Sequence, residues 1–329
     1  MMSVHQTYPV QSKLSRGLAD YFRKQALDNA FPPHLAGKDI SLLHNRFLAS
    51  RGQGELLTFR DGPEYTVINE RGSSDYIIIC DHSSNGVPER LNRLGLDDAE
   101  LSRHIGVDIG TATAGLYLQR KLDAAAIFAG FSRLVLDLNR GHDNPEQIAE
   151  VSDGTEIPGN INITSADKQT RREALYDTYH GKLSEMLDTR EQTGRTPILV
   201  FVHSCTPEMG GVQRPWEIGI LWNQNRELSK ILIEELQAER PDFNIGDNEP
   251  YSLLNPPPGN SIEKHAEIRG LPHIVVEFRQ DMMDTPEKAK EMAHLFMTCM
   301  EKAVEKYERA SYGKKALQHR QNQRIHRKH

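Results

Sequence analysis

The chain has 329 residues, of which 37% are hydrophobic and 26% charged, and its formal net charge is −6. These values are typical of a globular protein with one large or two ordinary domains. No run approaches the roughly 18 consecutive apolar residues of a membrane span, and the first residues lack the apolar core of a signal peptide. Three cysteines without metal-type spacing fit free thiols, so we expect a cytoplasmic protein with no membrane partner.

The chain divides into three predicted parts. Residues 1–60 form an N-terminal helical extension, with helices over Ser15–Asn29 and Ile40–Ser50, and its role as a lid, a dimer arm or packing stays open, as does the oligomeric state. Residues 61–310 form a catalytic α/β domain, and residues 311–329 form a basic, disordered tail. The tail carries six Lys or Arg and no acidic residue, so the rest of the chain sums to −12, which argues against nucleic acid as a partner.

Strands and helices alternate through the predicted catalytic domain. Continuous apolar runs indicate buried strands, and apolar residues at helical spacing indicate amphipathic helices. Strands are expected at Tyr65–Asn69, Tyr76–Cys80, Arg133–Leu138, Ile198–Val202, Trp216–Trp222 and His273–Phe278, and helices at Asp98–Lys121, Ser165–Arg190, Gln224–Glu239 and Thr285–Arg309. This order predicts an α/β fold, with a mainly parallel mixed sheet, helices on both faces and functional groups at the carboxyl ends of the strands.

Three apolar strands end in side chains that bind metals or move protons. His82, His203 and Glu277 would meet at one edge of the sheet if their strands are parallel. Imidazole and carboxylate are the ligands of a catalytic zinc, which keeps one position open for water. Glu277 lies within an apolar run, where burial gives a carboxylate the raised pKa of a general base. An ion pair with Arg279, two residues on and on the same strand face, is the alternative.

Two further segments carry groups that could contact a ligand. Asn139 and Arg140 could bind a carboxylate together, and Arg133 could polarise a carbonyl. The alternative is a surface strand edge with solvated charges, which the apolar Leu-Val-Leu core of the segment makes less favourable. Asp108 falls beside the apolar stripe of the predicted helix Asp98–Lys121. A carboxylate there needs a partner, which could be a metal, a backbone group or an arginine.

Seven segments in the same order resemble those of the N-formylglutamate amidohydrolase family. They are Cys80–Pro88, His104–Gly110, Ser132–Arg140, Val202–Pro207, Gln213–Trp216, Asp247–Tyr251 and Val276–Asp281. None is specific alone, but together they are. The family is similar in fold to the zinc carboxypeptidases and the aspartoacylases, so the resemblance implies a zinc-carboxypeptidase-like fold.

The resemblance also implies the roles of single residues. One zinc ion per chain would be held by His82, His203 and a carboxylate, with Glu277 as the base and later the acid. Arg133 would stabilise the developing oxyanion.

The substrate implied by the resemblance is a small N-acyl amino acid. Asn139 and Arg140 would bind its carboxylate, and Arg214 and Arg279 are further candidates for substrate binding.

The third zinc ligand departs from the carboxypeptidase pattern. Those enzymes supply a carboxylate three residues after the first His, and this chain has Asn85 there. Asp108 is the first candidate instead. Glu89 is the second, although Pro88-Glu89 also fits a helix start, and Asp81 is the third, although strand geometry would point it to the opposite face.

The predicted function is zinc-dependent hydrolysis of the amide bond of N-formylglutamate or a related N-acyl amino acid. The alternatives are a zinc hydrolase for another acylated or peptide substrate and a catalytically silent binding module on the same fold. Residues 208–222 and 247–265 are expected to shape the pocket. A small, doubly cationic pocket would favour a formylated acidic amino acid.

Overall fold

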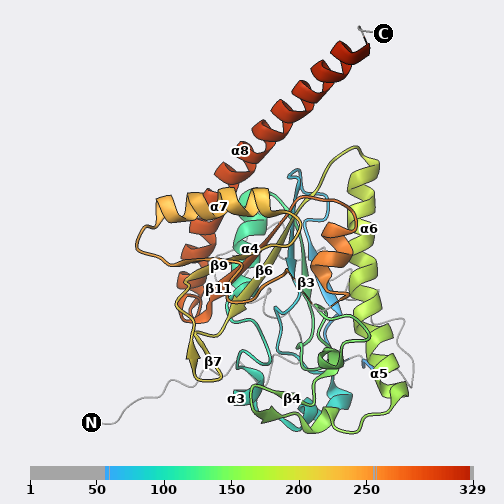
Figure 1. Cartoon of the computed structure of the whole chain (residues 1–329). Helices are drawn as coiled ribbons and strands as arrows, with labels where there is room; N and C mark the ends of the chain where they lie inside the picture. Colours follow the sequence, from blue (N-terminus) through green and yellow to red (C-terminus); the bar gives the residue numbers. More distant parts are fainter. Residues whose placement is uncertain (1–55, 59, 255, 257, 327–329) are drawn as a thin grey trace.

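The structure is a computed structural model that describes residues 56–58, 60–254, 256 and 258–326 (Figure 1). The helices expected at Ser15–Asn29 and Ile40–Ser50 therefore lie outside the described residues. Among the residues described, every helix is either too short or too polar to span a lipid bilayer.

One mixed sheet of seven strands forms the centre of the molecule. Its strands are β1 (Tyr65–Ile68), β2 (Tyr76–Cys80), β3 (Ala125–Ala129), β6 (Ile198–Cys205), β9 (Ile218–Leu221), β10 (Ile245–Asp247) and β11 (His273–Arg279). They lie in the order β1–β3–β2–β6–β11–β9–β10. The four strands β3, β2, β6 and β11 run parallel, whereas β1 is antiparallel to β3 and β9 is antiparallel to β11. The prediction of a mainly parallel mixed sheet is confirmed.

Helices cover both faces of this sheet, as predicted. They are α3 (Asp98–Leu101), α4 (Thr111–Leu122), α5 (Ser165–Arg171), α6 (Thr178–Gln192), α7 (Arg226–Glu239) and α8 (Pro286–His326), and a π-helical segment, Arg172–Asp177, joins α5 to α6. Helices α4, α7 and α8 pack on one face, and α6 packs on the other (Figure 1). The apolar run of β2 serves both layers, because Ile78 and Cys80 join the first cluster while Ile77 and Ile79 join the second.

Shorter elements complete the chain. Two hairpins are formed by β4 (Val151–Ser152) with β5 (Thr155–Glu156) and by β7 (Glu208–Met209) with β8 (Val212–Gln213). Short 3₁₀- or π-helical segments lie at Glu89–Gly95, Pro145–Ile148, Pro158–Asn160, Glu263–Glu267 and Gln280–Met282. Helix α8 continues to His326 and projects away from the sheet (Figure 1), so its backbone is helical in the region where the sequence predicts a disordered tail.

The predicted strand at Arg133–Leu138 is wrong. This segment is a buried chain of turns, held by bonds such as that from the Val135 amide to the Ser132 carbonyl at 2.9 Å. Its Leu-Val-Leu core packs in the cluster beneath the sheet, which explains the apolar pattern. The strand beside β2 is instead β3, whose alanine-rich sequence has little β propensity and was missed.

The predicted helix at Asp98–Lys121 is also wrong as a single element. It ends at Leu101 and a new helix begins at Thr111. Gly110 precedes α4 with a φ of +84°, a left-handed conformation that interrupts a continuous helix. Asp108 consequently lies in the loop between α3 and α4.

Candidate active site

Three buried side chains converge where β2, β6 and the α3–α4 loop meet. Nδ1 of His82 lies 3.3 Å from Oδ2 of Asp108, and Nδ1 of His203 lies 3.0 Å from the same oxygen. All three residues offer ligand atoms within 4.8 Å of one another. The residues that the sequence predicts as metal ligands are therefore brought together.

Local backbone geometry places each of these groups. His82 lies two residues beyond the end of β2, while His203 lies within β6. The amide of Asp108 donates to the carbonyl of His82 at 3.0 Å, and the amide of Ser204 donates to Oδ2 of Asp108 at 3.4 Å. The α3–α4 loop is thus tied to both neighbouring strands, which fixes the carboxylate between the two imidazoles.

A second carboxylate, that of Asp137, orients the ring of His82 through the nitrogen that does not face Asp108. Nε2 of His82 lies 2.8 Å from Oδ1 of Asp137. Oδ2 of Asp137 accepts two bonds from Arg133, at 2.7 and 3.1 Å, and Arg133 also donates to Oδ1 of Asp108 at 3.3 Å. Asp137 was given no role from the sequence. The available signal was a carboxylate directly after the Leu-Val-Leu run, where burial demands a partner.

The donor set fits a divalent metal. Because Nε2 of His82 faces the Asp137 carboxylate, that nitrogen carries the proton and Nδ1 presents a lone pair to Asp108. A lone pair and a carboxylate oxygen repel each other unless a cation or a proton lies between them. Ligand atoms 3.0 and 3.3 Å apart are also close to the roughly 3.4 Å expected between neighbours around a tetrahedral zinc with bonds of about 2.1 Å.

In the absence of a metal, protons on the histidines neutralise the charge of the Asp108 carboxylate. Burial and Arg133 lower the pKa of His82, but Asp137 and Asp108 outweigh them and raise it to about 9. Burial disfavours the charged form of Asp108, yet His82 and His203 outweigh burial and lower the pKa of its carboxyl group. With a metal or with protons, positive charge therefore lies between the two imidazoles and the Asp108 carboxylate.

Glu277 stands next to this cluster on the neighbouring strand. It is paired in register with His203 across β11 and β6. Burial, chiefly, raises the pKa of Glu277 to about 7, against the opposing effect of His203. A carboxyl group with this pKa can accept and return a proton near neutral pH.

A cavity of about 620 Å³ opens onto these groups. Its lining includes His82, Asp108, His203 and Glu277 at one end, and the segment 133–140, the β4–β5 hairpin and Tyr251 further out. Asn139 and Arg140 both line it. Oδ1 of Asn139 accepts a bond from the Ser261 amide at 3.0 Å, so the side chain of Asn139 is held in place.

The other two predicted substrate-binding arginines lie outside the cavity lining. Arg214 stacks on the ring of Tyr251 at 4.6 Å and donates to its hydroxyl at 2.9 Å. Arg279 is bound by two carboxylates, Glu217 at 3.0 Å and Asp281 at 2.8 Å. Their roles in substrate binding stay predictions.

The two alternative metal ligands lie apart from the cluster. Glu89 pairs with Arg60 at 2.8 Å at the surface. Asp81 is buried, but its Oδ1 accepts a bond from the Tyr179 hydroxyl at 2.6 Å. Among the described residues, Asp108 is thus the carboxylate that joins both histidines.

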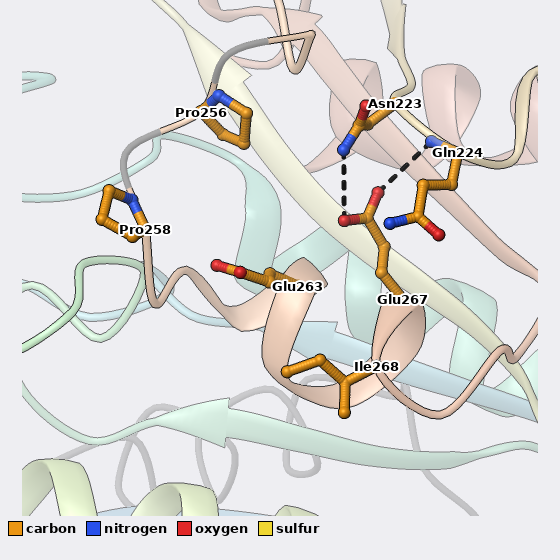
Figure 2. Close-up of a pocket in the computed structure, with 7 residues that line it drawn as sticks. All are labelled: Asn223, Gln224, Pro256, Pro258, Glu263, Glu267 and Ile268. Carbon is orange, nitrogen blue, oxygen red and sulfur yellow. Dashed lines mark hydrogen bonds between the residues drawn. The ribbon is translucent and has the colours of Figure 1, made fainter.

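A smaller hollow of about 270 Å³ adjoins the cavity at Pro256 (Figure 2). Glu267 lies on its wall and accepts bonds from Nδ2 of Asn223 at 3.3 Å and the Gln224 amide at 3.4 Å. None of the predicted site residues lines it, so the reactive groups belong to the larger cavity.

Comparisons with known proteins give the family. The sequence model of the family described as N-formylglutamate amidohydrolase matches residues 74–283. The structure is similar to that of gene product Atu2144 from Agrobacterium tumefaciens, with 30% identity, a TM-score of 0.74, and coverage of 77% of this chain and 100% of that one.

More distant likeness is found to N-formylglutamate amidohydrolase from Ralstonia eutropha JMP134, with 16% identity, a TM-score of 0.49, and coverage of 75% of this chain and 99% of that one. A search of curated protein sequences finds no match. The family match covers well over half of the chain and includes the residues that line the reactive end of the cavity. The chain therefore belongs to the N-formylglutamate amidohydrolase family, and it is an amidohydrolase.

Proposed function

We propose that the protein is a zinc-dependent hydrolase that cleaves the amide bond of N-formylglutamate or a related N-acyl amino acid. The observation that carries this proposal is the single oxygen of Asp108 that faces Nδ1 of both His82 and His203, while Nε2 of His82 is engaged by Asp137. Two imidazoles and a carboxylate leave one position open on zinc, as in catalytic sites.

His82, Asp108 and His203 would hold one zinc ion per chain. When bound, zinc would supply Lewis acidity for the amide carbonyl and make a water molecule acidic enough to attack near neutral pH. Glu277, one strand away from His203, takes the proton of the attacking water. It then returns a proton to the leaving nitrogen, and the burial that raises the pKa of Glu277 favours this exchange.

The segment 133–140 would bind and orient the substrate. Arg140, positioned with Asn139 on the cavity wall, pairs with the substrate carboxylate. Arg133 holds the carboxylates of Asp108 and Asp137 in place. Its side chain is 26% exposed and lines the cavity, which supports the further proposal that it also stabilises the oxyanion.

The test pairs metal content with hydrolysis in the wild type and in Glu277→Gln. The wild type is expected to bind about one zinc per chain and to hydrolyse an N-acyl amino acid. Glu277→Gln should keep zinc and lose about 10²–10⁴-fold in kcat, because proton transfer is lost while the ligands remain. Glu234→Gln, an exposed carboxylate on α7, is the matched control and should keep full activity.

Two results would count against the proposal. Failure to bind any divalent metal favours the binding-module alternative. Zinc binding without hydrolysis of N-acyl amino acids favours a peptide or another acylated compound as substrate.

A cytoplasmic location is part of the proposal and is supported by three free, buried cysteines.

A further inference from the structure

A chain of hydrogen bonds runs from the end of β11 to the loop that carries Asp108. Gln280 directly follows β11, the strand of Glu277, and is 6% exposed. Its Nε2 donates to the carbonyl of Ser204 at 3.1 Å and to Oγ of Ser204 at 3.2 Å. Oγ of Ser204 in turn donates to the carbonyl of Ile109 at 2.7 Å. Two side chains therefore join β11, β6 and the α3–α4 loop.

The direction of each bond in this chain is fixed by the backbone carbonyls at its ends. A carbonyl only accepts hydrogen bonds, so the nitrogen of the Gln280 side chain, and not its oxygen, must face the Ser204 carbonyl. That nitrogen also donates to the Ser204 hydroxyl, whose single proton is left for the carbonyl of Ile109. Both side chains are almost fully buried, so water has little access to these bonds.

Ser204 holds the Asp108 segment at two points. Its amide donates to Oδ2 of Asp108 at 3.4 Å, and this oxygen is the one that faces Nδ1 of His82 and of His203. Its hydroxyl holds the carbonyl of Ile109, the residue that follows Asp108. The side chain and the backbone of the ligand segment are thus both bound to one residue of β6.

The α3–α4 loop depends on such bonds because Asp108 lies between two helices and within neither. The Asp108 amide donates to the His82 carbonyl at 3.0 Å, and Oγ1 of Thr111 donates to the Asp108 carbonyl at 2.7 Å. These two bonds tie the loop to the end of β2 and to α4. The bonds of Ser204 tie it to β6 and, through Gln280, to the strand that carries the proposed base.

We propose that Ser204 and Gln280 are positioning residues that hold the Asp108 carboxylate where it can bind a divalent metal together with both histidines. Metal–ligand distances vary by only about 0.2 Å around their preferred values, so a carboxylate that is free to shift binds the ion less tightly. This inference rests on the proposed metal site and extends it to residues that act through Asp108.

Zinc affinity of the full-length protein, measured by competition with a chelator, tests this role. Ser204→Ala removes the hydroxyl, and Gln280→Met removes the donor while keeping the length of the side chain. Each should weaken zinc binding about tenfold, the lower end of the range for groups behind a ligand, because the bond from the Ser204 amide to Asp108 remains. Ser204→Thr keeps the hydroxyl and should restore the affinity; binding as weak as in Ser204→Ala would contradict a role for that hydroxyl.

The double variant tests whether the two residues act together. Ser204 and Gln280 share a hydrogen bond, so the loss of zinc affinity in Ser204→Ala with Gln280→Met should be smaller than the product of the two single losses. A loss equal to that product would show that the residues act independently, and would contradict a single network.

Two matched control variants separate positioning from stability. Ser229 is 1% exposed and its hydroxyl donates to the Asn225 carbonyl at 3.3 Å. Gln119 is 6% exposed and its Nε2 donates to the Ala124 carbonyl at 3.3 Å. Neither lines the cavity. Ser229→Ala and Gln119→Met should lower the free energy of unfolding, as the test variants do, and keep wild-type zinc affinity.

The outcomes separate this inference from the proposed function. Wild-type zinc affinity in both Ser204→Ala and Gln280→Met overturns the positioning role and leaves amide hydrolysis intact. An equal loss of zinc affinity in the control variants also overturns it, because the effect then follows from stability alone. A wild type that binds no divalent metal contradicts the proposed function itself, and this inference with it.

Discussion

The row of contacts from His82 through Asp137 to Arg133 decides which nitrogen of His82 can bind a metal. Asp137 accepts the Nε2 proton, and Arg133 secures the far oxygen of Asp137. Hydrogen-bonded carboxylates behind a ligand histidine fix its tautomer and raise its basicity. The affinity of the site for zinc should therefore depend on a residue that does not touch the ion.

Asp137→Asn tests this dependence. The substitution keeps the shape of the side chain but removes the charge that stabilises the Nε2 proton. Zinc affinity should fall about 10–100-fold, as measured by competition with a chelator.

The matched control is Asp143→Asn, an exposed carboxylate on the same segment of chain, whose zinc affinity should equal that of the wild type. An unchanged affinity in Asp137→Asn would show that Asp137 only neutralises Arg133.

The sequence predicts the three proposed metal ligands better than the residues that hold those ligands in place. His82, His203 and Asp108 are found together because each ends, or lies next to, an apolar segment that must be buried. The partnership of Asp137 with His82 was missed because it depends on the path of an irregular segment that was predicted to be a strand. Arg279 shares a strand with Glu277, yet pairs with Glu217, a contact that spacing along one strand does not reveal.

The start of helix α4 controls the position of Asp108. Gly110 adopts a φ of +84°, and a Cβ at this position would lie 2.6 Å from Cβ and 2.7 Å from the carbonyl oxygen of Met283. The chain can thus turn from the Asp108 loop into the helix only without a side chain here.

Gly110→Ala is expected to destabilise the fold by about 2–5 kcal/mol. Left-handed strain contributes about 1–2 kcal/mol and the clash with Met283 about 1–3 kcal/mol. The measurement is the free energy of unfolding by denaturant.

Gly154→Ala provides the control, because Gly154 has a φ of +74° but open space around it, so only the strain of about 1–2 kcal/mol remains. Equal losses in the two variants would mean that the Met283 contact relaxes without cost.

Strands were predicted correctly where the apolar pattern fits a strand and no other element. The runs that became β2, β6 and β11 are continuous, rich in β-branched residues and bounded by turns. Prediction failed at β3, where five small or apolar residues fit a helix equally well, and at Asp98–Lys121, where two glycines interrupt a helical period. Glycine conformation depends on neighbours such as Met283, which are distant in sequence.

At the scale of the whole molecule, a buried pair of histidines joins three segments. Nε2 of His180 on α6 donates to the carbonyl of Leu138 at 2.9 Å, so its Nδ1 must accept the proton of Nε2 of His265, at 2.7 Å. Both rings are neutral in this arrangement. Burial lowers the pKa of His265 to about 3, and the pKa of His180 lies well below its usual value for the same reason.

This pair should make the fold sensitive to acid. The pKa of His265 is about 3 in the folded state and about 6.5 when unfolded. Between these values the unfolded chain binds a proton that the folded chain does not. Stability is therefore fully present above pH 6.5 and falls by about 1.4 kcal/mol per pH unit for this histidine as the pH drops toward 3.

His265→Gln should reduce the slope of unfolding free energy against pH by about that amount. The measurement is denaturant unfolding between pH 4 and 7, with chelator present so that metal binding does not contribute. The exposed His294→Gln on α8 should keep the wild-type slope. A wild-type slope in His265→Gln would mean that His265 binds its proton equally well in the folded and unfolded states.

The register of β6 with β11 sets Glu277 beside His203 through backbone hydrogen bonds alone. Neighbouring strands lie about 4.8 Å apart whatever side chains they carry. The walls of the cavity, by contrast, come partly from two short surface hairpins, β4–β5 and β7–β8. Reaction geometry and substrate choice are thus encoded in different parts of the chain. Substitutions in the two hairpins could therefore change the substrate during evolution, while the positions of Glu277 and His203 stay the same.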